Sequence, residues 1–242
     1  MNPKKDKKPE LSEEEQMRRG SKTTTVLSFG IIIVTVLILL FAGIYLYVDS
    51  IQNYSDSTNT TDAFRFKNEY ESLNGKKDQD GNEYSKLTIS KQNPMSYVSA
   101  DEVLKLLDSG TGMIYIGSPK SSDCREIIPI LMSISAELGV DEIYYLDATS
   151  IRDVKERNPE TNEIETITEG TEEYYAIVSR LEEYLPAYEG LDDEAIKRLY
   201  FPTVVAVNNG HIVSSHTGGV GEKTSSEELK NIYKDMIEKT RK

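Results

Sequence analysis

The chain has 242 residues, and its 28 basic and 41 acidic side chains give it a formal net charge of −13. This acidic balance, without a basic patch that could neutralise phosphates, excludes nucleic acid as an expected partner. The single cysteine excludes an intramolecular disulfide and any cysteine-cluster metal site, and we expect neither a bound metal nor a cofactor.

The first 48 residues have the pattern of a membrane anchor. Residues 1–25 are polar, with seven basic and five acidic side chains, and we interpret them as a disordered cytoplasmic tail. Residues 26–48 form a run of 23 residues without a charge, and about 20 apolar residues suffice for a helix to span a bilayer. Tyr45 and Tyr47 lie at the far end of this run, where aromatic rings favour the membrane interface. The pattern predicts one transmembrane helix over 26–48.

The alternative interpretation of residues 26–48 is a cleaved signal peptide. The apolar part of a signal peptide has roughly 7–15 residues and precedes a small-x-small cleavage site, whereas this run is longer and no such site follows it. The basic residues precede the run, which predicts a cytoplasmic N-terminus and an extracytoplasmic C-terminal domain. We therefore expect a single-pass protein of the cell membrane, with the polar residues 49–62 as its linker.

We interpret residues 63–95 as an N-terminal extension of the extracytoplasmic domain. Residues 64–74 have a mild helical pattern, and residues 84–90 alternate weakly, which favours an edge strand. Between them, residues 76–83 predict a hairpin turn. A calcium loop is the less favoured interpretation, because Lys76 occupies the position of the first ligand.

The main domain, residues 96–242, begins with alternating helices and strands. Ser99 and Glu102 form a capping box before an apolar helical pattern. The apolar run at 113–116 predicts a buried strand, and residues 141–147 contain another. Helix, strand, helix, strand is the start of a parallel βαβ layout, so the α/β class is expected.

The turn after the first of these strands leads to the most informative helix. Residues 117–119 break the strand, and Ser121 or Ser122 then caps a helix with its hydroxyl. Cys124 lies in the first turn of that helix, and Pro129 lies inside it. Considered alone, a lone cysteine is most often a small buried apolar residue.

Residues 153–194 depart from a compact α/β pattern, because they hold fourteen acidic and three basic side chains. Apolar residues between Tyr174 and Leu185 repeat at helical spacing, so part of the segment is expected to pack. We favour a solvated acidic insertion, since charge runs are usually solvated faces. The alternative is a lid or a surface for a basic partner protein.

The last part of the chain predicts a hairpin and a final helix. Residues 201–207 form a strand pattern opened by a proline, residues 208–210 a tight turn, and residues 212–215 the returning strand. A serine at 225 or 226 caps the last helical pattern.

The segment from 113 to 129 resembles the active-site segment of thioredoxin-like proteins. That family has Cys-x-x-Cys at the start of a helix and a proline five residues later. This chain has Ser121-Ser122-Asp123-Cys124 and then Pro129, so serine stands at the position of the attacking cysteine. The lead-in at 115–119 is similar to that of membrane-anchored thioredoxin-like proteins of Gram-positive bacteria, including the group called bacteriocin transport accessory proteins.

The second half of the chain resembles the same family. Pro202-Thr203, the turn at Asn209-Gly210 and Gly218 match its spacing. The resemblance implies a thioredoxin-like fold, a central mixed sheet with helices on both faces, with 153–194 enlarged. It further implies a cis peptide bond before Pro202, beside which Phe201, Pro202 and Thr203 would bind an extended segment. Tyr115 stands where many members of the family bury an aspartate.

The degenerate position at Ser121 limits the chemistry. Dithiol exchange needs two sulfurs, and Cys124 has no internal partner to release a mixed disulfide. Ser121 would need an adjacent base to act as a nucleophile, and the two histidines, His211 and His216, are expected on the hairpin after Pro202. Without a second cysteine, these two histidines are also only weak evidence for a metal site.

Three hypotheses follow. The first is an extracytoplasmic thioredoxin-like protein that lacks dithiol activity and binds an extended segment of a protein partner at a groove between Ser121 and Pro202. The second is thiol-disulfide exchange, as a redox accessory, through the single Cys124. The third is a structural role in which the acidic insertion docks a membrane complex. Whether the chain is an enzyme depends on the reactivity of Cys124.

Overall fold

The computed structural model describes residue 40 and residues 43–44, 61–221 and 224–241. The predicted tail at 1–25, nearly all of the predicted membrane span at 26–48 and nearly all of the linker lie outside the described residues. Within the part of the chain that the structure describes, no helix has both the length and the apolar composition needed to cross a bilayer. The chain divides into two units, residues 1–60 and 61–242. The description below concerns the second unit.

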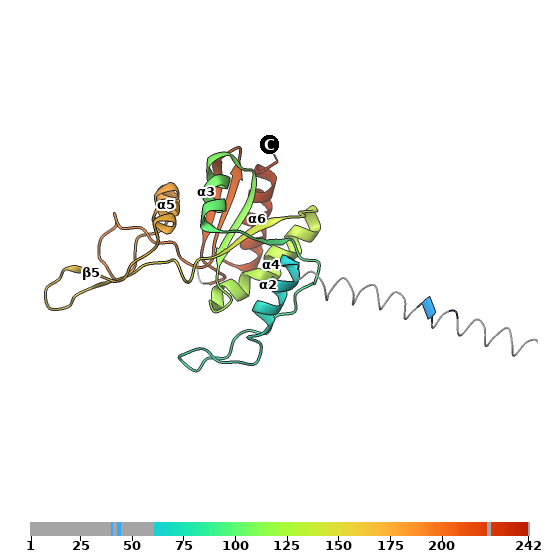
Figure 1. The fold of residues 1–242 in the computed structure, drawn as a ribbon, viewed down its shortest axis with the longest axis horizontal. Helices are drawn as coiled ribbons and strands as arrows, with labels where there is room; N and C mark the ends of the chain where they lie inside the picture. Colours follow the sequence, from blue (N-terminus) through green and yellow to red (C-terminus); the bar gives the residue numbers. More distant parts are fainter. Residues whose placement is uncertain (1–39, 41–42, 45–60, 222–223, 242) are drawn as a thin grey trace, which may run out of the picture. The chain divides into compact units, whose positions relative to one another are not determined.

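The second unit is built on a five-stranded sheet with the strand order β1-β3-β2-β6-β7 (Figure 1). Its strands are β1 (Met95–Tyr97), β2 (Gly112–Gly117), β3 (Ile143–Asp147), β6 (Thr203–Asn208) and β7 (His211–Thr217). Strand β3 pairs in parallel with β1 and β2, whereas β6 pairs antiparallel with β2 and β7. The sheet is therefore mixed, and the predicted α/β class is confirmed.

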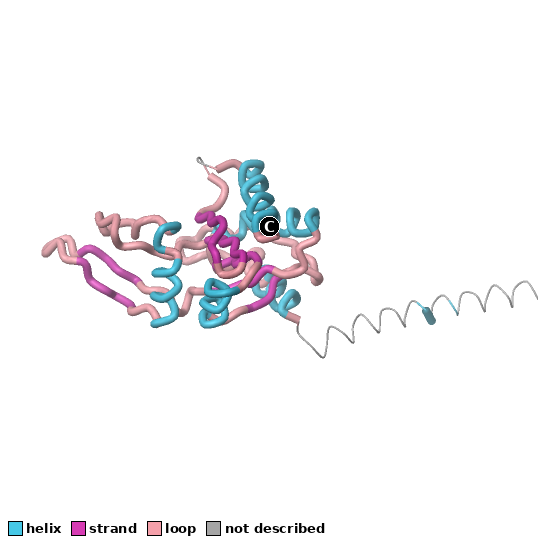
Figure 2. Tube along the Cα trace, turned by 90° about the horizontal axis from the view of Figure 1, so that it is seen from above, coloured by secondary structure: helices cyan, strands magenta, loops and turns pink. Residues whose placement is uncertain are grey.

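Helices cover both faces of this sheet (Figures 1 and 2). They are α2 (Asp62–Glu71), α3 (Ala100–Ser109), α4 (Ser122–Leu138), α5 (Glu172–Arg180) and α6 (Ser226–Lys239). Met113 and Tyr115 of β2 belong to the buried cluster of α2, α4 and α6, whereas Ile114 and Ile116 belong to the cluster of α3 and α5. Successive side chains of a strand point to opposite faces, so one apolar run serves two cores.

The predicted helix starts are confirmed. Ser99 precedes α3 and Ser225 precedes α6, and each forms a capping box with the glutamate three residues later. The serine hydroxyl accepts an amide of the first turn, and the glutamate accepts the amide of the serine in return. These caps fix where each helix begins.

For the extension at 63–95, the predicted helix is confirmed and the predicted edge strand is wrong. The helical pattern forms α2, and Lys77 and Glu83 form an isolated antiparallel bridge around the predicted turn. Residues 84–90, however, form no strand. Their backbone bonds to side chains of α2 and the turn after it, as Leu87 does with Asn74. The backbone of residues 84–90 therefore bonds to side chains instead of pairing with another strand. Strand β1 forms the edge of the sheet.

Arg125 ties this extension to α4. Its side chain is fully buried. The guanidinium donates to the carbonyl oxygens of Tyr70 at 2.8 Å, Pro119 at 3.3 Å and Ser85 at 2.6 Å, and to the side-chain oxygen of Asn74 at 2.9 Å. Five donors in a planar fork suit such a ring of acceptors. The buried Arg125 side chain therefore bonds to three separate segments of the chain.

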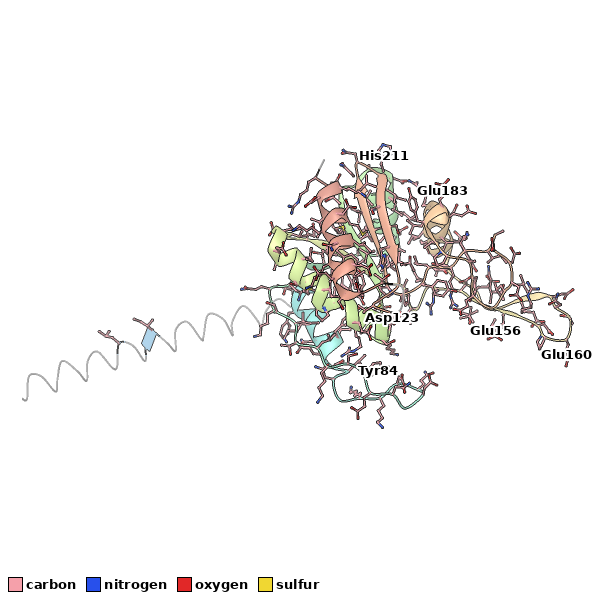
Figure 3. All side chains as sticks on the ribbon, turned by 180° about the vertical axis from the view of Figure 1, so that it is seen from behind. Tyr84, Asp123, Glu156, Glu160, Glu183 and His211 are labelled. Atoms are coloured by element: carbon pink, nitrogen blue, oxygen red, sulfur yellow. The ribbon has the colours of Figure 1, made fainter. Side chains whose placement is uncertain are left out.

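The acidic segment at 153–194 has two parts. Its first part is a two-stranded antiparallel hairpin of β4 (Val154–Arg157) and β5 (Ile164–Thr168), which extends away from the main sheet (Figure 1). Glu156 and Glu160 lie on this hairpin, as Figure 3 shows. This hairpin was not predicted.

The second part of the acidic segment packs. Tyr174 and Ile177 of α5 and the following Leu181 are buried in the second core cluster. A 3₁₀ turn (Glu182–Tyr184) follows α5. The predicted amphipathic helix is therefore confirmed, and it forms part of the core rather than a detached lid.

Candidate binding site at the start of helix α4

The start of α4 is fixed by Ser121. This residue caps the helix, and its side-chain oxygen accepts a hydrogen bond from the Cys124 amide at 3.3 Å. The same hydroxyl donates to the backbone carbonyl of Phe201 at 3.4 Å. A residue 80 positions away in the sequence is thereby held beside the helix start. Of the two serines that the sequence indicated as caps, Ser121 is the cap, whereas Ser122 is the first residue of the helix itself.

The loop before β6 supplies the other side of the site. The peptide bond between Phe201 and Pro202 is cis. The Pro202 carbonyl accepts the Gly218 amide at 2.9 Å, and the Thr203 hydroxyl donates to the Tyr200 carbonyl at 2.8 Å. Within the described residues, the backbone amide of Phe201 donates to no acceptor. The loop is held on its inner side, and the Phe201 amide is left for another partner.

The segment after β7 closes the third side of the site. A β-carbon placed on Gly219 would lie 2.8 Å from the β-carbon of Asp123, so only glycine allows this approach. Asp123 is labelled near the start of α4 in Figure 3. We use the name Ser121 groove for the region in which Ser121, residues 201–203 and Gly219 come together, where the sequence predicted a groove. The structure therefore brings all the predicted binding residues to one place.

Cys124 lies beneath this groove rather than in it. Its side chain has no exposed surface, and its sulfur accepts the Ser118 amide at 3.4 Å. Burial raises the pKa of the Cys124 thiol, and the charge of Asp123 adds to this rise. Hydrogen bonds from Tyr115, Ser118 and Ser121 oppose it without cancelling it. The thiol is therefore neutral near pH 7 and shielded from reagents.

A cluster of buried tyrosines surrounds the cysteine. The Tyr115 hydroxyl lies 2.8 Å from the Tyr70 hydroxyl, and the Tyr115 ring stacks on Tyr145 with centroids 5.3 Å apart. A β-carbon on Gly117 would lie 2.9 Å from the Cys124 sulfur, so this glycine makes room for the cluster. Strand alternation places Tyr115 and Tyr145 on one face, but the sequence contains no signal that Tyr70 of α2 reaches them.

Two arginines near the groove were not predicted. The guanidinium of Arg152 lies over the Phe201 ring, 4.4 Å from its centroid. Arg198 lies over the Tyr188 ring at 4.3 Å and near the Tyr200 ring at 5.5 Å. No local sequence pattern indicates these positions, because both arginines flank an acidic segment and reach the groove only through the tertiary fold.

The two histidines do not join the site chemistry. Both lie on β7, where His211 is exposed and His216 is half-buried. Burial lowers the pKa of His216, although a hydrogen bond with the Gly218 backbone opposes this. In the described part of the chain, no group of three or more histidine, cysteine, aspartate or glutamate side chains is arranged to hold a metal ion.

No family model matches this chain, and no curated protein matches it. Any functional assignment therefore rests on the geometry of the site.

Proposed function

We propose that this chain is a membrane-anchored, extracytoplasmic thioredoxin-like protein that binds an extended segment of a partner protein in the Ser121 groove. The single observation that carries the proposal is the link between the Ser121 hydroxyl and the Phe201 carbonyl at 3.4 Å. This link holds the backbone of residue 201 at the groove, and its amide has no acceptor within the described residues. An extended peptide can satisfy such an amide by strand-like pairing.

The topology supports the thioredoxin-like part of the proposal. Three parallel strands, β1, β3 and β2, are followed across the sheet by the antiparallel β6 and β7. The start of α4 follows β2, and Pro202 precedes β6, so both lie at the ends of neighbouring central strands. Binding sites of open α/β sheets commonly lie at strand ends of this kind.

The state of Cys124 favours binding over redox chemistry. Thiol-disulfide exchange begins with an accessible thiolate, whereas the Cys124 thiol has no exposed surface and a raised pKa. Release of a mixed disulfide needs a second sulfur, and the chain has one cysteine. Exchange through Cys124 with an external thiol remains the alternative function, and it would require the start of α4 to open.

The membrane anchor is the second part of the proposal. It rests on the 23 uncharged residues at 26–48 and on the basic residues that precede them. We expect the full chain to sediment with membranes, and an external protease to cut it only when the outer side is accessible. Recovery of the protein in the aqueous fraction would contradict the anchor.

Peptide binding by the full chain tests the proposed groove. The probe is a library of blocked hexapeptides, and binding is measured by fluorescence anisotropy. We expect Ser121→Trp to weaken binding at least about tenfold, because the indole would fill the space beside Phe201. Ser225→Trp is the matched control, since Ser225 also caps a helix and accepts a first-turn amide at 3.3 Å. Equal binding by both variants would place any peptide site elsewhere.

A further inference from the structure

Arg152 and Arg198 are held against aromatic rings beside the Ser121 groove. Arg152 covers the Phe201 ring at 4.4 Å, and Arg198 lies 4.3 Å from the centroid of Tyr188. A guanidinium over an aromatic face is attracted by the ring and loses part of its freedom to move. The two charged groups are therefore placed before any ligand arrives.

The two tyrosine rings that lie against Arg198 are themselves fixed by hydrogen bonds. The Tyr188 hydroxyl accepts the Lys155 amide at 2.7 Å, and the Tyr200 hydroxyl accepts the Glu189 amide at 2.6 Å. Each ring is anchored at its far end by a backbone group. A preorganised charged group loses less entropy when it binds a partner.

Neither guanidinium has an acceptor of its own. Within the described residues, no hydrogen bond or ion pair of the Arg152 or Arg198 side chain is formed, and the Nε of Arg198 is buried without a partner. Arg157 and Arg180 differ, since Arg157 donates to the Leu191 carbonyl and Arg180 pairs with Asp108. A buried donor that is left unpaired is costly, and both arginines remain partly exposed, so an anion can still reach the pair.

The nearest carboxylate is engaged elsewhere. Asp153 accepts the Tyr174 hydroxyl at 2.9 Å and pairs with Lys155 at 3.3 Å. Burial lowers the pKa of Arg152, and the positive charge of Arg198 lowers it further. The charge of Asp153 opposes this lowering only in part, so the two cations repel each other in a chain whose formal net charge is −13.

We propose that Arg152 and Arg198 form a carboxylate-binding subsite beside Phe201, which receives a carboxylate of the segment bound in the Ser121 groove. This inference rests on the proposed function and names the chemistry of its ligand. The fork of an arginine matches a carboxylate with two parallel hydrogen bonds. The carboxylate comes from an aspartate or glutamate side chain or from a free C-terminus. Since the chain carries a formal net charge of −13 and repels such groups on the whole, the subsite also sets the register of the segment.

The test uses the full chain and positional hexapeptide libraries in three forms. One form has a fixed glutamate and both ends blocked, the second has glutamine instead, and the third has glutamine and a free C-terminal carboxylate. We expect the carboxylate forms to bind about tenfold tighter than the blocked glutamine form. A preference for the first form identifies a side chain as the source, and a preference for the third identifies the C-terminus.

Variants then assign the preference to the two arginines. Arg152→Gln and Arg198→Gln are each expected to reduce the preference to near unity while the blocked glutamine library still binds. Arg65→Gln is the control, because Arg65 also stacks on a tyrosine, Tyr97, at 3.7 Å. Arg198→Lys keeps the charge without the fork and is expected to retain part of the preference, which covers the case in which Arg198→Gln does not fold.

The outcomes separate this inference from the function on which it rests. No binding by any library would overturn both. Binding without a carboxylate preference, or a preference that both glutamine variants retain, would overturn the subsite and leave the groove standing. Stronger binding of a phosphoserine library than of either carboxylate form would overturn the assignment to a carboxylate.

Discussion

The hydroxyl oxygens of Tyr70 and Tyr115 lie 2.8 Å apart in the core, although one residue belongs to α2 and the other to β2. Both side chains are fully buried, so removal of one hydroxyl deprives the other of a short buried hydrogen bond. We expect Tyr70→Phe and Tyr115→Phe each to lower the free energy of unfolding by about 1–3 kcal/mol. Urea denaturation of each variant measures this.

The double variant sharpens that prediction. Once one hydroxyl is absent, removal of the other no longer breaks the bond between them, so the combined cost is expected to be smaller than the sum of the single costs. Tyr184→Phe is the control, since this side chain is 42% exposed, and we expect a change within about 0.5 kcal/mol. Strictly additive costs would mean that the two hydroxyls do not act as a pair.

The alkylation rate of Cys124 separates binding from redox chemistry. Because the thiol is buried and its pKa is raised, iodoacetamide at pH 7 is expected to react at least about 100-fold more slowly with the native than with the unfolded chain. The native rate should rise only above the ordinary cysteine pKa of about 8.5. A fast native reaction with a midpoint below about 7.5 would favour exchange through Cys124.

Ser121→Cys tests whether position 121 has the geometry of the missing nucleophile. The Ser121 oxygen lies 3.3 Å from the Cys124 amide, so a sulfur at this place would lie close to the Cys124 sulfur. We expect glutathione disulfide to oxidise the two thiols to an intramolecular disulfide and to be reduced to two glutathione thiols. Titration of free thiols before and after oxidation measures the reaction.

Ser122→Cys is the matched control for this experiment. Ser122 is exposed and is the first residue of α4, and its side chain does not contact the Cys124 amide. We expect that variant to keep both thiols or to form mixed disulfides with glutathione. If Ser121→Cys behaves in the same way, residue 121 does not stand at the attacking position.

Glu71 is expected to make stability dependent on pH. Its carboxylate accepts the Ile89 amide at 2.7 Å. Partial burial raises the pKa of Glu71, but this hydrogen bond and the neighbouring Lys67 outweigh it, and the pKa is lowered. A lowered folded pKa gives stability that is present above the ordinary value of about 4.3 and is lost as the pH falls through the folded value.

We therefore expect Glu71→Gln to cost about 1 kcal/mol at pH 7 and progressively less below about pH 4. Urea denaturation of both proteins from pH 7 to pH 3 gives the two stability curves. Glu227→Gln is the control, because that side chain is 77% exposed and, among the described residues, pairs only with Lys230. A gap between wild type and Glu71→Gln that stays constant over this range would contradict the role of the carboxylate.

The sequence predicted those parts of the fold whose signals are local. Capping boxes, buried apolar runs and the turn at 208–210 depend on residues a few positions apart, and all of them appear where expected. The strand expected at 84–90 was wrong, because alternating burial arises there from packing against α2 rather than from a ladder. The hairpin of β4 and β5 was missed, since its exposed polar strands lack the apolar alternation that marks a half-buried strand.

In the candidate site, too, the local features were predicted from the sequence and the long-range contacts were not. Ser121 was identified because capping is a relationship between a residue and its own helix. Its bond to Phe201, and the approach of Arg152 to the Phe201 ring, join segments far apart in the chain. Contacts of this kind depend on the complete tertiary structure, and no periodicity in the sequence encodes them.

The contacts of Arg125 also limit how far the domain can be truncated from its N-terminal side. Its guanidinium holds oxygens of Tyr70, Asn74 and Ser85, all of which precede the sheet. A fragment that starts at β1 would lose these acceptors of Arg125 and would expose apolar residues that Phe66 and Tyr70 of α2 cover, and both changes are costly. The smallest autonomous fragment should therefore begin no later than Thr61, the cap of α2. The segment before the sheet is therefore an integral part of the domain and not a linker.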